Sequence, residues 1–143
     1  ADRQVWAVDG REVFPVRSGR RPMSAAAKAA HKEWTLDVIS SAFTCEGHRF
    51  FSHACDGPYD AAHILPKRFL KDATLGWDED KALTVIFDKR NGLCLCRAAH
   101  NVWDGPYCPV VWEQLPAEVV SFATEHGMLW KLEKMYPPKA QAA

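Results

Sequence analysis

Two short segments in the middle of the chain hold side chains suited to acid–base chemistry and metal binding. Residues 59–66 read YDAAHILP, and residues 91–104 read NGLCLCRAAHNVWD. A neutral imidazole has a pKa near 6.5 and can take a proton from water, which makes His63 a candidate general base. His100 and a carboxylate such as Asp60 can hold a divalent ion that polarises a phosphate and stabilises its leaving group. Together the two segments have the groups needed to hydrolyse a phosphodiester.

The order of these residues resembles the signature of the HNH (ββα-metal) endonucleases. The chain matches that family at His-Ile-x-Pro, Asn-Gly-Leu, Leu-Cys and the closing His-x-x-Trp-Asp, in that order. The resemblance implies a metal-dependent DNA endonuclease in which His63 activates the attacking water and His100 binds the metal ion. It also implies that Asn91 orients the loop and the His63 ring. Asn-Gly is a strong turn pair as well, and a turn can be what holds the Asn91 side chain.

The chain departs from the common family pattern at the residue before the candidate base. Many members carry a His or Asp there that binds the metal, whereas this chain has Ala62. Because side chains alternate along a strand, Asp60 shares a face with Ala62 and is the natural substitute ligand. Asp104 and Asn101 are further candidates. The resemblance implies Mg, Mn, Ni or Zn as the catalytic ion, and Ala62 leaves open an alternative: a catalytically inactive, zinc-stabilised DNA-binding module.

The cysteines favour metal binding over disulfides, because their number is odd and no secretion signal opens the sequence. They are Cys45, Cys55, Cys94, Cys96 and Cys108. Many HNH proteins carry a structural zinc, and the resemblance suggests one here. Its expected ligands are Cys45, His48, Cys55 and Cys96, with His53, Cys94 and Cys108 as spare donors. The alternative is a set of ordinary buried thiols. A nucleobase deaminase is disfavoured, since the sequence lacks the Pro-Cys-x-x-Cys motif of that class.

Several elements must position these groups. Ser24 can cap a helix that runs to about Phe43, with apolar residues at helical spacing. Residues 59–64 and 93–95 are expected to be strands, and a helix should begin near Arg97. Residues 83–87 fit either a strand or a short helix. Pro116 starts a further helical stretch that Gly127 divides or kinks.

The expected fold class is α+β, with a ββα-metal core over about residues 58–104 flanked by N- and C-terminal helices. The length of 143 residues fits one domain. We expect a basic N-terminal arm over residues 1–23, which includes a weak hairpin signal at Asp9-Gly10. The nuclease domain should span residues 24–136, and residues 137–143 should form a flexible tail.

Charge and hydropathy bear on the partners. The formal net charge is zero, but basic residues gather near the N-terminus and around the central motif. Local basic patches matter more than the total charge when the partner is a polyanion. The expected partner is double-stranded DNA, and the candidate contacts are Arg20, Arg21, Lys67, Arg68 and Arg97. Cutting both strands from one site per chain would call for a homodimer. No apolar run is long enough for a membrane span, so we expect a cytoplasmic protein of a bacterial or phage-infected host cell.

Overall fold

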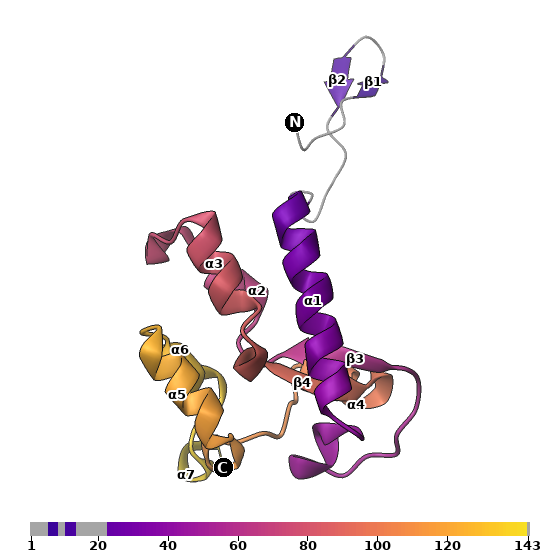
Figure 1. The fold of residues 1–143 in the computed structure, drawn as a ribbon, viewed down its shortest axis with the longest axis vertical. Coiled ribbons are helices and arrows are strands. Elements are labelled where there is room, and N and C mark those ends of the chain that lie inside the picture. Colours follow the sequence, from indigo (N-terminus) through magenta and orange to yellow (C-terminus); the bar gives the residue numbers. More distant parts are fainter. Residues whose placement is uncertain (1–5, 9–10, 14–22, 143) are drawn as a thin grey trace.

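An antiparallel pair of strands and the helix that follows it form the centre of the fold (Figure 1). The structure is a computed structural model that describes residues 6–8, 11–13 and 23–142. Strand β3 (Tyr59–His63) pairs with β4 (Gly92–Cys96), so that Tyr59 lies opposite Cys96 and His63 opposite Gly92. Helix α4 (Arg97–Trp103) follows β4 directly. The predicted α+β class and the ββα order are confirmed.

Helix α1 (Ala25–Ser41) packs on both strands of this sheet (Figure 1). It begins where the sequence predicted, because the Ser24 side chain accepts a hydrogen bond from the Ala27 N–H at 3.1 Å. Trp34 and Val38 are buried and form a small apolar cluster with Cys94 of β4. Gly92 permits this close approach, since a Cβ there would lie 2.5 Å from Val38.

The chain between β3 and β4 forms four short helices. They are α2 (Lys67–Leu70), η2 (Ala73–Leu75), α3 (Glu79–Ile86) and η3 (Lys89–Asn91). Residues 83–86, which fitted a strand or a helix, belong to α3. The Asp78 side chain accepts a hydrogen bond from the Lys81 N–H at 2.8 Å, and this cap commits the segment to a helix.

The C-terminal part supplies much of the apolar core. After η4 (Trp112–Gln114) come α5 (Ala117–Glu125), α6 (Leu129–Met135) and α7 (Lys139–Ala142), which Figure 1 shows grouped together. Phe122 and Leu132 are fully buried in one cluster with Leu95 of β4. Gly127 separates α5 from α6 with a φ of 68°. Helix α7 lies in the segment that the sequence predicted to be a tail.

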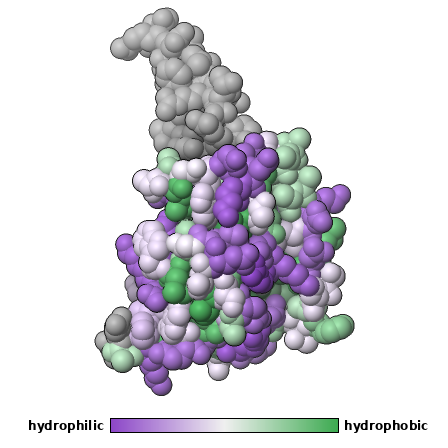
Figure 2. Space-filling model, turned by 60° about the vertical axis from the view of Figure 1, so that its left-hand side comes forward, coloured by the Kyte–Doolittle hydropathy of each residue, from purple (hydrophilic) through white to green (hydrophobic). Residues whose placement is uncertain are grey.

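Two shorter elements precede β3. Strands β1 (Trp6–Val8) and β2 (Arg11–Val13) pair antiparallel, in agreement with the hairpin signal. Arg20 and Arg21 lie outside the described residues. A 3-10 turn, η1 (Glu46–Arg49), packs on β4. On the face drawn in Figure 2, hydrophilic and hydrophobic residues are interleaved. None of the helices in the described part of the chain has both the length and the apolar character to cross a membrane.

Candidate active site and metal centres

His63 is the last residue of β3, and its ring lies flat against Trp34 of α1. The two ring centroids are 4.1 Å apart and the planes differ by 18°. Phe87 approaches the same imidazole at 5.7 Å with its plane turned by 59°. The candidate base is therefore held in an aromatic pocket built by elements on both sides of the sheet in sequence.

The environment keeps the His63 imidazole neutral. Burial lowers its pKa to about 3, and the positive charges of Lys67 and His31 act in the same direction. Its Nε2 is buried without a hydrogen-bond partner, and no other buried side-chain nitrogen or oxygen of the described residues shares that property. A buried, unpaired ring nitrogen is costly to the free protein and is ready for a partner from outside.

Side chains from three distant elements fix the backbone that follows His63. The Trp103 indole N–H donates to the His63 carbonyl at 3.2 Å, and the Tyr136 hydroxyl donates to the Ile64 carbonyl at 2.7 Å. Asn91 binds both backbone groups of Leu65, accepting from its N–H at 2.8 Å and donating to its carbonyl at 3.1 Å. The turn that sets the direction of His63 therefore has its polar groups paired with protein atoms.

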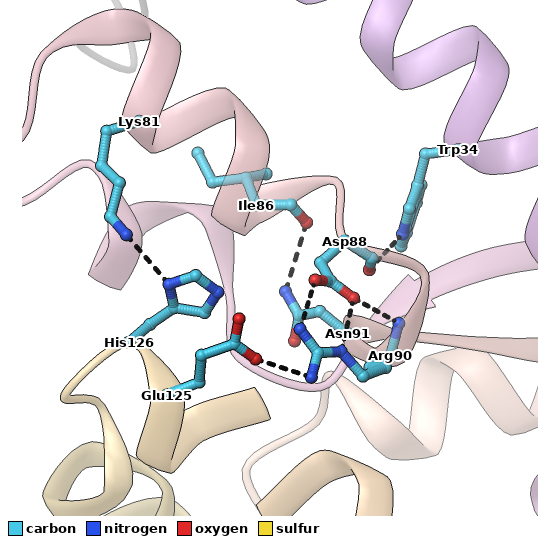
Figure 3. A network of polar contacts seen from close by, with 8 residues as sticks. All are labelled: Trp34, Lys81, Ile86, Asp88, Arg90, Asn91, Glu125 and His126. Atoms are coloured by element: carbon cyan, nitrogen blue, oxygen red, sulfur yellow. Dashed lines mark hydrogen bonds and ion pairs between the residues drawn. The ribbon is translucent and has the colours of Figure 1, made fainter. Parts of the chain in front are cut away.

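Asn91 acts on the loop around the site. Its side chain is fully buried and also donates to the Ile86 carbonyl at 3.3 Å (Figure 3). The resemblance implied that Asn91 orients the loop and the His63 ring. Its hydrogen bonds go to backbone groups of Leu65 and Ile86, which supports the first half of that expectation.

A carboxylate flanks each ring nitrogen of His100 on α4. Asp60 Oδ2 lies 3.0 Å from Nδ1, and Asp104 Oδ2 lies 3.0 Å from Nε2. Hydrogen bonds with Asp104 and Asp60 raise the pKa of His100, although burial opposes them. Asp60 also forms a two-point ion pair with Arg97, at 2.6 and 3.0 Å, and this pair lowers the pKa of Asp60 to about 2.

Asp60 and His100 fit a divalent ion. Two ligands in neighbouring positions of an octahedral ion, each at about 2.1 Å, lie about 3 Å apart. The separation of Asp60 Oδ2 from His100 Nδ1 has this value of 3.0 Å. Asp104 faces the other nitrogen, so the two carboxylates and one imidazole nitrogen do not converge on a single point. Asn101 is exposed on α4.

His63, His100 and Asp104 line one cavity of about 620 Å³. Lys67 and Arg68, two of the expected DNA contacts, line it as well. Arg97, also expected to contact DNA, is instead engaged by Asp60. A further imidazole in the cavity wall, His31 of α1, was not predicted. Its spacing of three residues from Trp34 was the available signal, because both then lie on one face of the helix.

A second candidate metal centre lies where η1 meets the start of α4. One ligand atom from each of Cys45, His53, Cys55 and Cys96 lies within 4.8 Å of the others. His53 Nε2 is 3.4 Å from the sulfurs of both Cys45 and Cys55. The structure thus gathers the three expected thiols but supplies His53 where the sequence suggested His48. The His48 ring stacks on His53 at 4.2 Å, and its Nε2 is 3.1 Å from the Cys55 sulfur.

The chemistry of this cluster fits zinc. Three sulfurs and one imidazole are a common tetrahedral zinc ligand set. Zinc binds the thiolate form of cysteine. Burial alone would raise the pKa of Cys96, but hydrogen bonds, among them that from the Ala99 N–H at 3.4 Å, lower it to about 6. Cys94 is buried beside Trp34, and Cys108 lines the cavity near His63, so both lie outside the cluster.

Residues 38–108 match the family model described as HNH endonuclease. This part of the chain belongs to the HNH endonuclease family. It contains β3, β4, α4 and every residue of the two candidate metal centres, and it begins within α1, after Trp34. No curated protein and no solved structure matches the chain. Membership of the family points to a nuclease that uses a divalent metal ion.

Proposed function

We propose that the chain is a metal-dependent endonuclease of double-stranded DNA, with His63 as the base that takes a proton from the attacking water. The observation that supports this most is the unpaired, buried Nε2 of a neutral His63 in the same cavity as His100. A general base must be unprotonated and must have a ring nitrogen free to accept a proton. The family match supports the same reaction class.

The proposed reaction divides the work among a few side chains. His63 accepts the proton, and Asp60 and His100 hold the divalent ion. When bound, such an ion polarises the phosphate and stabilises the leaving oxygen. Lys67 and Arg68 contact DNA phosphates from the cavity wall. A phosphate anion near His63 favours the protonated ring, so substrate binding raises the pKa of His63 from its low value in the free protein.

We also propose that Cys45, His53, Cys55 and Cys96 hold a structural zinc ion. Cys45 precedes η1, and Cys96 is the residue between β4 and α4. A zinc ion at this point ties the two together, and therefore fixes the end of the helix that carries His100. This role is separate from catalysis, because the cluster lies outside the groove that contains His63.

Plasmid cleavage tests the nuclease proposal. His63→Ala should lower the cleavage rate in Mg²⁺ or Mn²⁺ by about 10²- to 10⁴-fold while duplex binding stays nearly unchanged. His126→Ala is the matched control, because His126 lies on the far side of α3 from the cavity residues and contacts Lys81. Undiminished cleavage by His63→Ala would remove His63 from the mechanism.

One observation favours the alternative of an inactive DNA-binding module. Ala62 provides no ligand, and the substitute carboxylate of Asp60 is already paired with Arg97. This alternative predicts duplex binding with no cleavage in Mg²⁺, Mn²⁺, Ni²⁺ or Zn²⁺. The same plasmid assay, run across these four ions, separates the two functions.

A further inference from the structure

The contact between Trp34 and His63 depends on a missing side chain. His63 and Gly92 are directly paired across the β3–β4 sheet, and cross-strand partners point to the same face. Gly92 therefore leaves an opening beside His63, and the indole of Trp34 enters it. A Cβ on Gly92 would lie 2.9 Å from the Trp34 ring, which is closer than real contacts allow. The Asn-Gly pair thus has a second use here, as the space for an aromatic ring.

Trp34 is itself fixed in place. Its side chain is 2% exposed, and its indole N–H donates to the Asp88 carbonyl at 3.1 Å (Figure 3). The Asp88 carboxylate caps η3 by accepting from the Arg90 N–H at 2.9 Å, and η3 ends at Asn91. The indole is thereby attached to the same loop that Asn91 fastens to the turn after His63.

We propose that Trp34 is the positioning residue of His63: its indole, seated over Gly92, holds the imidazole in the one orientation that presents Nε2 to the attacking water. The torsion that turns a histidine ring is broad and has no strong preference of its own. A flat stack at 4.1 Å restricts that rotation, and the edge of Phe87 restricts it from a second side. This inference rests on the proposed nuclease function for its effect on rate.

The device belongs to this chain and lies beyond the matched family segment. The match begins at residue 38, so Trp34 lies outside it, whereas His63 and Gly92 lie inside. A correctly placed base needs a geometry within a fraction of an ångström, and small misplacements can cost about 100-fold in rate. Loss of the indole should therefore act on the chemical step and leave DNA affinity alone.

The test compares Trp34→Leu and Trp34→Phe with Val38→Ala as the control. Val38 is buried in the same cluster on the same helix, but it has no ring to stack on His63. We expect Trp34→Leu to lower kcat for duplex cleavage by about 10- to 100-fold with KM changed less than about threefold. Trp34→Phe, which keeps a ring, should recover most of kcat. Val38→Ala should lower the melting temperature and leave kcat unchanged.

A second readout does not need catalysis. In protein labelled with ¹³C at the histidine Cε1 and free of DNA and metal, the ring current of Trp34 should shift the His63 Hε1 resonance upfield. Trp34→Leu should abolish that shift, and Val38→Ala should keep it. Should Trp34→Leu not fold, Gly92→Ala makes the same test, because its Cβ displaces the indole.

Three results would overturn the proposal. They are an unchanged His63 resonance in Trp34→Leu or Gly92→Ala, wild-type kcat in Trp34→Leu, or an equal loss of kcat in Val38→Ala. If wild-type protein shows the shift but cleaves no DNA, the proposed function fails while the orientation of His63 by Trp34 stands.

Discussion

Asp60 faces two cations, the Arg97 guanidinium and the His100 imidazole, and a divalent ion must compete with both. The ion pair with Arg97 is partly exposed, with 55% of the Arg97 side chain accessible, and such pairs are worth about 0.2–1 kcal/mol. Arg97→Gln should therefore tighten Mn²⁺ binding by about two- to fivefold. Asp60→Asn should weaken it by at least about 10-fold, because a charged ligand is lost. Calorimetric titration of Mn²⁺ measures both.

Asp104→Asn is the matched control for this titration. It removes a carboxylate at the same distance of 3.0 Å from His100, but at the opposite ring nitrogen. Binding of Mn²⁺ should change little in this variant. A larger loss in Asp104→Asn than in Asp60→Asn would place the ion at Nε2 and make Asp104 its ligand.

The depressed pKa of His63 gives the stability of the protein a defined pH dependence. The unfolded chain takes up a proton near pH 6.5, whereas folded His63 does so only near 3. Stability due to this group is complete above about pH 6.5 and is lost as pH falls toward 3. Urea unfolding at pH 7 and pH 4.5 should show a loss that is smaller in His63→Gln, by on the order of 2 kcal/mol. His100, whose pKa is raised, is present in both proteins and cancels in the comparison. Equal losses would show that His63 titrates normally in the folded protein.

The sequence identified the types of the site residues better than their partners. His63 and His100 could be chosen because they stand in an ordered motif. The pairing of Arg97 with Asp60 depends on the register that sets Tyr59 opposite Cys96, and no single segment contains that information. Trp34 was recognised only as a core position, since helical spacing reports burial and not the identity of the neighbour.

At the scale of elements, the cluster of thiols joins η1 to the start of α4. We expect purified protein to hold close to one zinc per chain, as measured by elemental analysis. Structural zinc contributes to folding directly, so His53→Ala should lower both the zinc content and the melting temperature, the latter by about 10 °C. His48→Ala is the control and should keep both, because His48 stacks on the cluster from outside it. Zinc-free protein that is folded and active would show that these residues are ordinary buried thiols.

The exchange of His48 for His53 shows where element-level prediction ends. Cys45-x-x-His48 has a spacing common in zinc sites, but η1 is a 3-10 turn, and the chain after it returns toward Cys45. Helices and strands with clear periodicity or caps, such as α1 and β3, were predicted well. The path of an irregular loop such as residues 50–58 is set by the surfaces it packs on, which the local sequence does not encode.

At the scale of the whole molecule, the C-terminal helices hold the core through a single hydroxyl. Tyr136 is 3% exposed and donates to the Ile64 carbonyl at 2.7 Å. Tyr136→Phe leaves that buried carbonyl without a partner, which should cost about 1–3 kcal/mol of the free energy of unfolding. Tyr107→Phe removes the same hydroxyl from a side chain that is 91% exposed, and it should be neutral. Urea unfolding of the two variants measures the difference, and equal stability would mean that water replaces the Tyr136 hydroxyl.

The overall class was predictable because the ββα motif and the capped helices point to one architecture. The sequence could not show that α5 is joined to the active-site loop. Arg90 bridges Asp88 of that loop and Glu125 of α5, and Lys81 lies 3.0 Å from the neighbouring His126 (Figure 3). These partners come from separate parts of the chain, so only the folded arrangement reveals them.

The bond from Tyr136 to Ile64 also bears on protein synthesis. A ribosome must add 72 residues after Ile64 before the hydroxyl that fastens the turn behind His63 exists. During translation, the emerging chain therefore carries His63 and His100 long before the groove has its final shape. A nuclease built this way gains its cutting power late, when its last helices have left the ribosome, and nascent fragments are harmless to the nucleic acid around them.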